Sequence, residues 1–298
     1  VDDASPTAQT RKLIEEACLK DRRIRSKFLS KNGGISTATN AAISIAKGGF
    51  ICLFDHDDLL DVDALHEVVL ALNDKPYDLL YTDEDKIVDT QASRHQPFCK
   101  TGWNQDAMYT GNYVTHFATI RKSLLDKIGC EDPRFDGAQD WELFLRCARS
   151  SGAAKIHHIP KVLYSWRVHP NSTSKTIEAK PYVVKAQKNA IDSDLKARGH
   201  TDYTVEQDIR HPGQWTITFP LPPNDPKVCI VLRPIQATAR NLQQISKRTS
   251  YKNFEVVVGN GSEIWTKTRD ADYVVAYNGN LVLRDQDWIQ SLLRDAAR

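Results

Sequence analysis

The chain has 298 residues, of which 41% are hydrophobic, so it can bury the core of one large domain or two smaller ones. Its formal net charge of +2 is close to neutral and gives no reason to expect nucleic acid as a partner. No apolar run approaches the length of a membrane span, which argues against a membrane-embedded protein.

Helix and strand patterns alternate in the first part of the chain. We expect helices at residues 7–21, 36–49 and 62–74, and strands at residues 23–29, 50–54 and 77–85. Residues 50–54 form a continuous apolar run, which is typical of a strand covered on both faces. Repeated β-α-β units predict an α/β, Rossmann-like fold whose sheet is mainly parallel and has helices on both faces.

The start of the chain, "VDDASP", is typical of the end of a further strand. Three predicted strands thus end in acidic residues, at Asp2–Asp3, Asp55–Asp58 and Asp83–Asp85. Parallel sheets bind ligands at the carboxyl ends of their strands, so we expect these acids to gather at one edge. Asp55 and Asp57 are two residues apart, so on an extended strand end they point the same way and offer hard oxygen donors for Mg²⁺ or Mn²⁺. The alternative is that these acids only favour the positive end of the next helix.

The pattern changes after Lys100. A strand and helix are expected at residues 116–129, a helix at 138–152 and a strand at 155–169. A polar stretch with a proline cluster follows and is typical of a linker. We therefore divide the chain into a first domain at residues 1–174, a linker region at 175–226 and a further unit at 227–298.

The last part of the chain repeats the first. Residues 272–293 align without gaps with residues 49–70, and Asn278 and Asn280 stand where Asp55 and Asp57 stand in the first copy. Amide side chains cannot replace two carboxylates at a metal ion. The sequence therefore predicts a partial, degenerate second unit that carries out no metal-dependent chemistry.

The six cysteines include no C-x-x-C pair, which disfavours a zinc or redox motif. Cys52 and Cys229 lie in strand patterns and Cys147 in a helix pattern. We expect these three to be buried free thiols in a reducing compartment.

An ordered set of motifs resembles the inverting family 2 glycosyltransferases with the GT-A fold. The motifs are "VDDAS", "NGGISTATNAA", "FICLFDHDDLL", "GAQDWELFLRCA" and "PKVLYSWRVHPNSTS". "LLYTDEDKI" and "KPYVVKAQKNA" also resemble bacterial members that carry two such domains in tandem and build O-antigen or related surface polysaccharides. Because the family domain begins with a strand and helix before "VDDAS", we expect that the chain is a fragment lacking them.

The resemblance implies how the nucleotide and metal are held. Asp2 and Asp3 match the acids that hold the donor's nucleoside. Asn32 matches a position near the base and ribose, and Asp55 matches a residue that faces the ribose. Asp57 matches a metal ligand, and His169 matches a histidine near the diphosphate. From the residues alone, Asp2 and Asp3 are more typical of a turn, and Asn32 is equally typical of a turn. A single histidine on a loop is more often structural.

The resemblance also implies a catalytic base, Asp140, which would take the proton of the attacking hydroxyl. The alternative is that Asp140 only stabilises the start of its helix, where the dipole favours the charged carboxylate. Trp141 would stack on a sugar or fill the core, and Arg167 would pair with phosphate oxygens. Asp83 and Asp85 are weaker candidates for contacts with the acceptor or the metal.

We therefore expect a metal-dependent, inverting transfer of a sugar from a UDP- or dTDP-sugar to a hydroxyl of a growing surface glycan or lipid-linked glycan. The location would be cytoplasmic, with peripheral association at the inner face of the membrane. The rival interpretation is a sugar-nucleotide-binding scaffold without turnover. A nucleotidyltransferase is disfavoured because no glycine-rich phosphate loop is recognisable.

Overall fold

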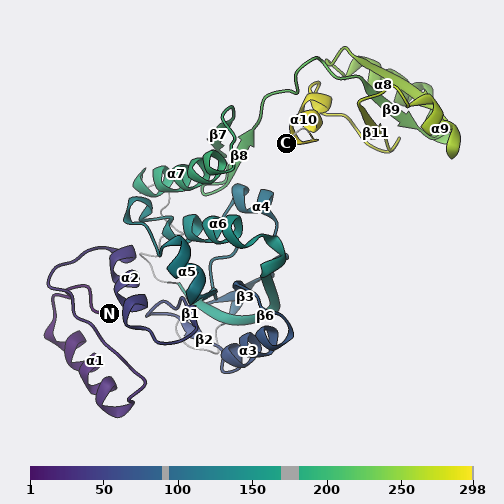
Figure 1. The fold of residues 1–298 in the computed structure, drawn as a ribbon. Helices are drawn as coiled ribbons and strands as arrows, with labels where there is room; N and C mark the ends of the chain where they lie inside the picture. Colours follow the sequence, from purple (N-terminus) through teal and green to yellow (C-terminus); the bar gives the residue numbers. More distant parts are fainter. Residues whose placement is uncertain (89–93, 169–180, 297–298) are drawn as a thin grey trace. The chain divides into compact units, whose positions relative to one another are not determined.

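The computed structural model describes residues 1–88, 94–168 and 181–296 (Figure 1). These residues form two compact units. The first comprises residues 1–201 and 205–217, and the second comprises residues 202–204 and 218–298. The α/β class predicted from the sequence is confirmed, because a central mixed sheet in the first unit is surrounded by helices.

Most elements of the first unit lie where the sequence patterns predicted them. Its helices are α1 (Ala8–Lys20), α2 (Ile35–Ile45), α3 (Ala64–Asp74), α4 (Gln105–Thr110), α5 (Lys122–Ile128), α6 (Gln139–Ser151) and α7 (Pro181–Ala197), with short 3-10 turns at Pro133–Phe135 and Ala153–Lys155. Its strands are β1 (Phe50–Cys52), β2 (Leu59–Leu60), β3 (Leu79–Ile87), β4 (His95–Phe98), β5 (Thr119–Arg121) and β6 (Ile156–Arg167), followed by the hairpin β7 (Thr204–Gln207) and β8 (Trp215–Thr218). The strand expected at residues 23–29 is reduced to one bridge between Asp2 and Phe28.

The sheet of the first unit has the strand order β1-β5-β3-β6-β2, with β4 paired to β3. Its pairing is mixed, whereas the β-α-β pattern predicted a mainly parallel sheet. The long pair β3–β6 is parallel, and the pairs β1–β5, β3–β5, β2–β6 and β3–β4 are antiparallel. Few residues separate β3 from β4 in the chain, and short connections join antiparallel strands, whereas parallel strands need a long crossover.

The core of the first unit lies on both faces of β3, which is buried along its length except at Lys86. Side chains alternate between the two faces of a strand, so Leu80 joins the cluster formed by Ala64 and Val68 of α3. Helix α6 lies on the other side of the sheet (Figure 1). Its side chains Trp141, Phe144, Leu145 and Ala148 follow a helical period and are all buried.

Strand β1 is less covered than its apolar sequence predicted. Among the described residues it pairs with β5 alone, and only Ile51 is buried while Cys52 is exposed. The expectation of a buried thiol was therefore wrong for Cys52, because β1 lies at the edge of the sheet. It is confirmed for Cys147 and Cys229, and all six cysteines are free.

Residues 175–226, expected to be a linker, contain α7 and the β7–β8 hairpin. Val183, Ala186, Ala190 and Ile191 of α7 are buried and follow a helical period, which the polar composition of the region concealed. Asp194 is 2% exposed and accepts a hydrogen bond from Tyr109 at 2.7 Å, besides pairing with two arginines. Helix α7 is thereby attached to α4 and α6.

The second unit has a parallel sheet of order β10-β9-β11. Its elements are β9 (Val228–Leu232), α8 (Ala239–Lys247), β10 (Phe254–Val258), α9 (Ser262–Lys267), β11 (Tyr273–Ala276) and α10 (Trp288–Ala296), with a 3-10 turn at Pro234–Gln236. In the gapless alignment with the first copy, β11 and α10 correspond to β1 and α3. Asn278 and Asn280 lie in the turn between them, where the backbone N–H of Asn280 donates to Asn278 Oδ1 at 3.1 Å.

Within the described ranges, none of the helices has both the length and the apolar character needed to cross a membrane.

Candidate active site

A cavity of about 1650 Å³ opens in the first unit and brings together Asp55, Asp57, Asp140 and Trp141 from the residues predicted for the site. The first two lie in the turn after β1, and the other two begin helix α6. These segments are more than 80 residues apart in the chain, and the fold places them on one cavity. Further lining comes from residues 98–101, 110–113, 115–116 and 136–139, from Trp166, and from α7 and the 212–214 turn.

The turn from Asp55 to Asp58 is held by Tyr164 of β6. The hydroxyl of Tyr164 donates to Asp58 Oδ2 and accepts the backbone N–H of Asp55 at 3.3 Å. Asp58 Oδ1 accepts the backbone N–H of Arg167 at 2.7 Å, and the Arg167 guanidinium donates to the carbonyl of Asp57 at 2.6 Å. The predicted phosphate ligand Arg167 thus fixes the turn through its backbone and side chain.

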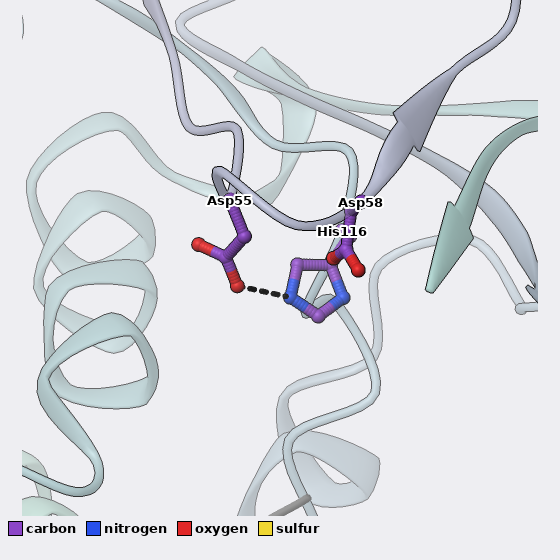
Figure 2. Close-up of side chains that lie close together, drawn as sticks. All are labelled: Asp55, Asp58 and His116. Atoms are coloured by element: carbon purple, nitrogen blue, oxygen red, sulfur yellow. Dashed lines mark ion pairs between the residues drawn. The ribbon is translucent and has the colours of Figure 1, made fainter. Parts of the chain in front are cut away.

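His116 lies beside this turn and was not singled out from the sequence (Figure 2). Its ring stacks on Tyr164, with centroids 4.6 Å apart and planes inclined by 7°. Its Nε2 lies 3.6 Å from Asp55 Oδ2, and its Nδ1 lies 3.3 Å from Glu84 Oε2. Both ring nitrogens therefore face a carboxylate, an arrangement that favours the doubly protonated imidazolium.

Glu84 is also the partner of a fully buried ammonium group. The Lys100 side chain is 0% exposed and donates to Glu84 Oε2 at 2.9 Å and to the carbonyl of Val114 at 2.7 Å. It further contacts Thr115 Oγ1 and the carbonyl of His116. One chain of alternating charges thus runs through Lys100, Glu84, His116 and Asp55. We call it the Lys100–Asp55 network.

The charges of the network shift each other's protonation. Burial lowers the pKa of His116, but the hydrogen bonds and charges of Asp55 and Glu84 outweigh it and raise that pKa to about 10. Burial raises the pKa of Glu84, and His116 and Lys100 reverse this and lower it to about 2. The hydrogen bond from His116 also lowers the pKa of Asp55 against the effect of burial. Asp55 is therefore an ionised carboxylate at neutral pH.

Asp140 has the opposite environment. It lies in the first turn of α6, where Asn112 Nδ2 donates to its Oδ2 at 2.8 Å and the backbone N–H of Trp141 donates to its Oδ1 at 2.8 Å. Burial raises the pKa of Asp140, and this outweighs the Trp141 N–H, the charge of His116 and the Asn112 amide. A carboxylate with a raised pKa is a better proton acceptor, as a general base requires.

Glu131 is a second acid near Asp140 that the sequence did not indicate. Burial and then the charge of Asp140 raise the pKa of Glu131 to about 8. Its Oε2 is buried and has no hydrogen-bond partner within the described part of the chain. It lines a smaller cavity of about 360 Å³ together with Asp140. Glu131 is therefore largely neutral at pH 7, so it does not add a full negative charge beside the Asp140 carboxylate.

Of the residues predicted to contact the nucleoside, Asp55 lines the large cavity, whereas Asp2, Asp3 and Asn32 do not. Asp3 accepts the backbone N–H groups of Gly33 at 2.8 Å and Gly34 at 3.0 Å, and Asn32 donates to the carbonyl of Asp3 at 3.2 Å. Asp2 accepts the N–H of Ser5 at 3.1 Å. These bonds join the two turns at residues 2–5 and 32–34, which is the turn-forming alternative considered for these residues.

Asp83 and Asp85 lie inside β3 and not at a strand end, so they do not join the acids of the cavity. Asp83 is paired with His158 Nε2 at 2.7 Å, and Asp85 with Arg94 Nε at 2.6 Å. Trp141 is 2% exposed and donates to the carbonyl of Met108, which makes it a core residue. His169 lies outside the described residues.

The acids of the cavity fit a hard divalent cation at Asp55 and Asp57. Their side chains are 56% and 37% exposed, so oxygen atoms of both are accessible from the cavity. Asp55, Asp58 and His116 also lie close enough to share an ion, since their ligand atoms are within 4.8 Å of one another. That second grouping fits poorly, because both oxygens of Asp58 accept hydrogen bonds and an imidazolium has no free lone pair for a metal.

Comparison with known proteins agrees with the motifs. Residues 1–129 match the family model for glycosyl transferase family 2. Over 267 residues the chain is 37% identical to an uncharacterized protein of Sinorhizobium fredii, covering 88% of this chain and 29% of that protein. Over 263 residues it is 32% identical to the O-antigen biosynthesis protein RfbC of Myxococcus xanthus, covering 87% of this chain and 20% of RfbC. These matches confirm the resemblance to family 2 glycosyltransferases.

The chain spans less than a third of the length of these two relatives, at 29% and 20%. Among solved structures, it is similar to residues 1–349 of TarS from S. aureus in complex with UDP-GlcNAc. The TM-score is 0.48 at 17% sequence identity, over 65% of this chain and 61% of that one.

The Lys100–Asp55 network makes stability depend on pH. The pKa of His116 is about 10 in the folded chain and 6.5 in the absence of interactions, so the stabilisation is complete below pH 6.5 and is lost as the pH rises through 10. We expect the free energy of unfolding of the metal-free first unit to decrease between pH 7 and 10 more steeply in the wild type than in His116→Gln. Urea unfolding with excess EDTA at several pH values measures both slopes. Equal slopes would show that His116 is neutral in the folded protein.

Proposed function

We propose that the first unit transfers a sugar, with inversion at the anomeric carbon, from a nucleotide-diphospho-sugar to a hydroxyl of a growing surface glycan. The observation that carries this proposal is that Asp55, Asp57 and Asp140 line the same cavity. Such a transfer needs two kinds of group, namely carboxylates suited to a metal–diphosphate complex and an acid with a raised pKa.

In this proposal Asp140 is the general base. Its carboxylate accepts the proton of the acceptor hydroxyl while that oxygen bonds to the anomeric carbon and the nucleoside diphosphate leaves from the opposite face. The Asn112 amide holds one carboxylate oxygen in place through the 2.8 Å hydrogen bond. Burial keeps the pKa above its ordinary value although the residue begins a helix. This combination supports base catalysis over a purely structural role.

Asp57 and Asp55 would hold Mg²⁺ or Mn²⁺, which would neutralise negative charge on the leaving diphosphate. Their exposed oxygens and the low pKa of Asp55 support this assignment. His116 and Tyr164 orient Asp55 from the protein side. Asp2, Asp3 and Asn32 stay predictions for contacts with a uracil or thymine nucleoside, and Asp55 also stays a prediction for a contact with its ribose. His169 stays a prediction for the diphosphate or metal. An acceptor linked to lipid would bring the protein to a membrane surface peripherally.

Nucleotide binding tests the metal assignment. We expect UDP or dTDP to bind more tightly with Mn²⁺ than without it, and Asp57→Ala to remove the Mn²⁺-dependent gain because one carboxylate ligand is lost. Calorimetric titration of the whole chain measures both affinities. The matched control is Asn280→Ala, the equivalent position in the second unit, which should leave both affinities unchanged. Binding that needs neither Mn²⁺ nor Asp57 would contradict the assignment.

Turnover tests the base. We expect Asp140→Asn to lower the transfer rate about 10²- to 10⁴-fold, because an amide cannot accept the proton. Donor affinity should stay near that of the wild type. Release of nucleoside diphosphate in the presence of cell-envelope glycan measures the rate, and Asp126→Asn, an exposed acid on α5, is the control. Loss of donor binding in Asp140→Asn would indicate a structural role, and a wild type that binds but never transfers would indicate a scaffold.

A further inference from the structure

The large cavity has more room than one donor needs. Pockets for single small ligands are usually about 300–1,000 Å³, whereas this cavity has a volume of about 1650 Å³. The acids proposed to bind the donor come from the turn after β1. A separate part of the lining comes from α7 and the turn between β7 and β8. This part, which we call the α7 wall, consists of Tyr182, Val183, Gln187 and residues 212–214.

The α7 wall is firmly attached beside the proposed base. Gly137 has φ +99°, and a Cβ atom there would lie 3.1 Å from the Tyr182 ring and 3.2 Å from Val183 Cγ2. The loop that leads into Asp140 therefore packs directly against the start of α7. At the other end of the wall, Trp215 Nε1 donates to Gln187 Oε1 at 3.2 Å and holds the hairpin to the helix. The buried Asp194 cluster fixes the same helix to α4 and α6.

The chemistry of the wall suits sugar hydroxyls and C–H faces. Tyr182 is 59% exposed, and its ring offers an apolar face with a polar edge. The amides of Gln187 and Gln214 can donate to and accept from hydroxyl groups. The α7 wall carries no charged side chain.

The described part of the cavity lining offers an anionic ligand no basic side chain that is not already paired. Among the described residues that line the cavity, the basic side chains are those of Lys100 and His116, and both already pair with Glu84. The acids Asp55, Asp57, Asp136 and Asp140 outnumber them. A carboxylate on the ligand would meet like charges without a partner, which disfavours its binding.

We propose that the α7 wall is the acceptor subsite and that it takes an uncharged stretch of glycan, with Tyr182 stacked on a sugar ring. This inference rests on the proposed transfer reaction, and it adds where the acceptor lies and which class of sugar chain it is. The acceptor then reaches Asp140 from the side of α7, while the donor occupies the side of Asp55 and Asp57.

The test is binding of the whole chain, with UDP and Mn²⁺, to an array of oligosaccharides that includes neutral members and members containing uronic acid. We expect retention of neutral oligosaccharides, and weakening of about tenfold in Tyr182→Ala, which loses the stacked ring. Tyr182→Phe should restore binding. Trp265→Ala, which removes an aromatic side chain of the second unit that is 74% exposed, is the control and should have no effect.

Failure of this inference differs from failure of the proposed function. Three results would each overturn the acceptor subsite. They are a preference for oligosaccharides that contain uronic acid, a failure to retain any neutral oligosaccharide, and equal glycan binding by Tyr182→Ala and the wild type. The affinity for UDP with Mn²⁺ is measured on the same proteins and should be the same in Tyr182→Ala and wild type. If Tyr182→Ala lowers the affinity for UDP as much as it lowers glycan binding, the residue only supports the fold. That result would also overturn the acceptor subsite.

Discussion

The site depends on one buried ion pair. The Lys100 ammonium is wholly removed from water, and a buried charge of this kind is tolerated only when it is paired and fully hydrogen-bonded. Glu84 supplies the opposite charge, and the same carboxylate oxygen then faces His116. His116 in turn faces Asp55 at the edge of the cavity. The position of Asp55 therefore follows from a charge balance that begins in the interior of β3.

Three aspartates close to the site show how environment divides one side-chain type into different roles. The hydrogen bond from the His116 imidazolium lowers the pKa of Asp55 and keeps it ionised. Burial raises the pKa of Asp58, but its hydrogen bonds to Tyr164 and Arg167 use both of its oxygens to fix the turn. Burial raises the pKa of Asp140, whose carboxylate accepts hydrogen bonds from the Asn112 amide and the Trp141 backbone N–H. The first fits a metal and donor, the second holds the turn, and the third fits proton transfer.

The sequence predicted the α/β class and most elements, because helical and strand periodicities are local. It also placed Asp55, Asp57 and Asp140 in one site through ordered motifs, and all three line the cavity. It missed His116 and Lys100, because their contacts join residues that are distant in the chain and no local pattern marks them. It included Glu84 only as part of the acidic run at residues 83–85 and did not predict its pairing with Lys100 and His116. The grouping of Asp83 and Asp85 with the other acids did not hold because β3 continues past them to Ile87. The sequence did not indicate helix α7, because the polar composition of this region conceals the helical spacing of its buried residues.

The acids after β1 and the proposed base on α6 should act as one site. Paramagnetic broadening by Mn²⁺ measures their proximity, because the effect falls steeply with distance from the ion. In the chain with UDP, Mn²⁺ should broaden the NMR signal of the Asn112 side-chain amide, which is hydrogen-bonded to Asp140, whereas Mg²⁺ should leave it sharp. The broadening should disappear in Asp57→Ala. An Asn112 signal that stays sharp while Mn²⁺ and UDP are bound would contradict the account.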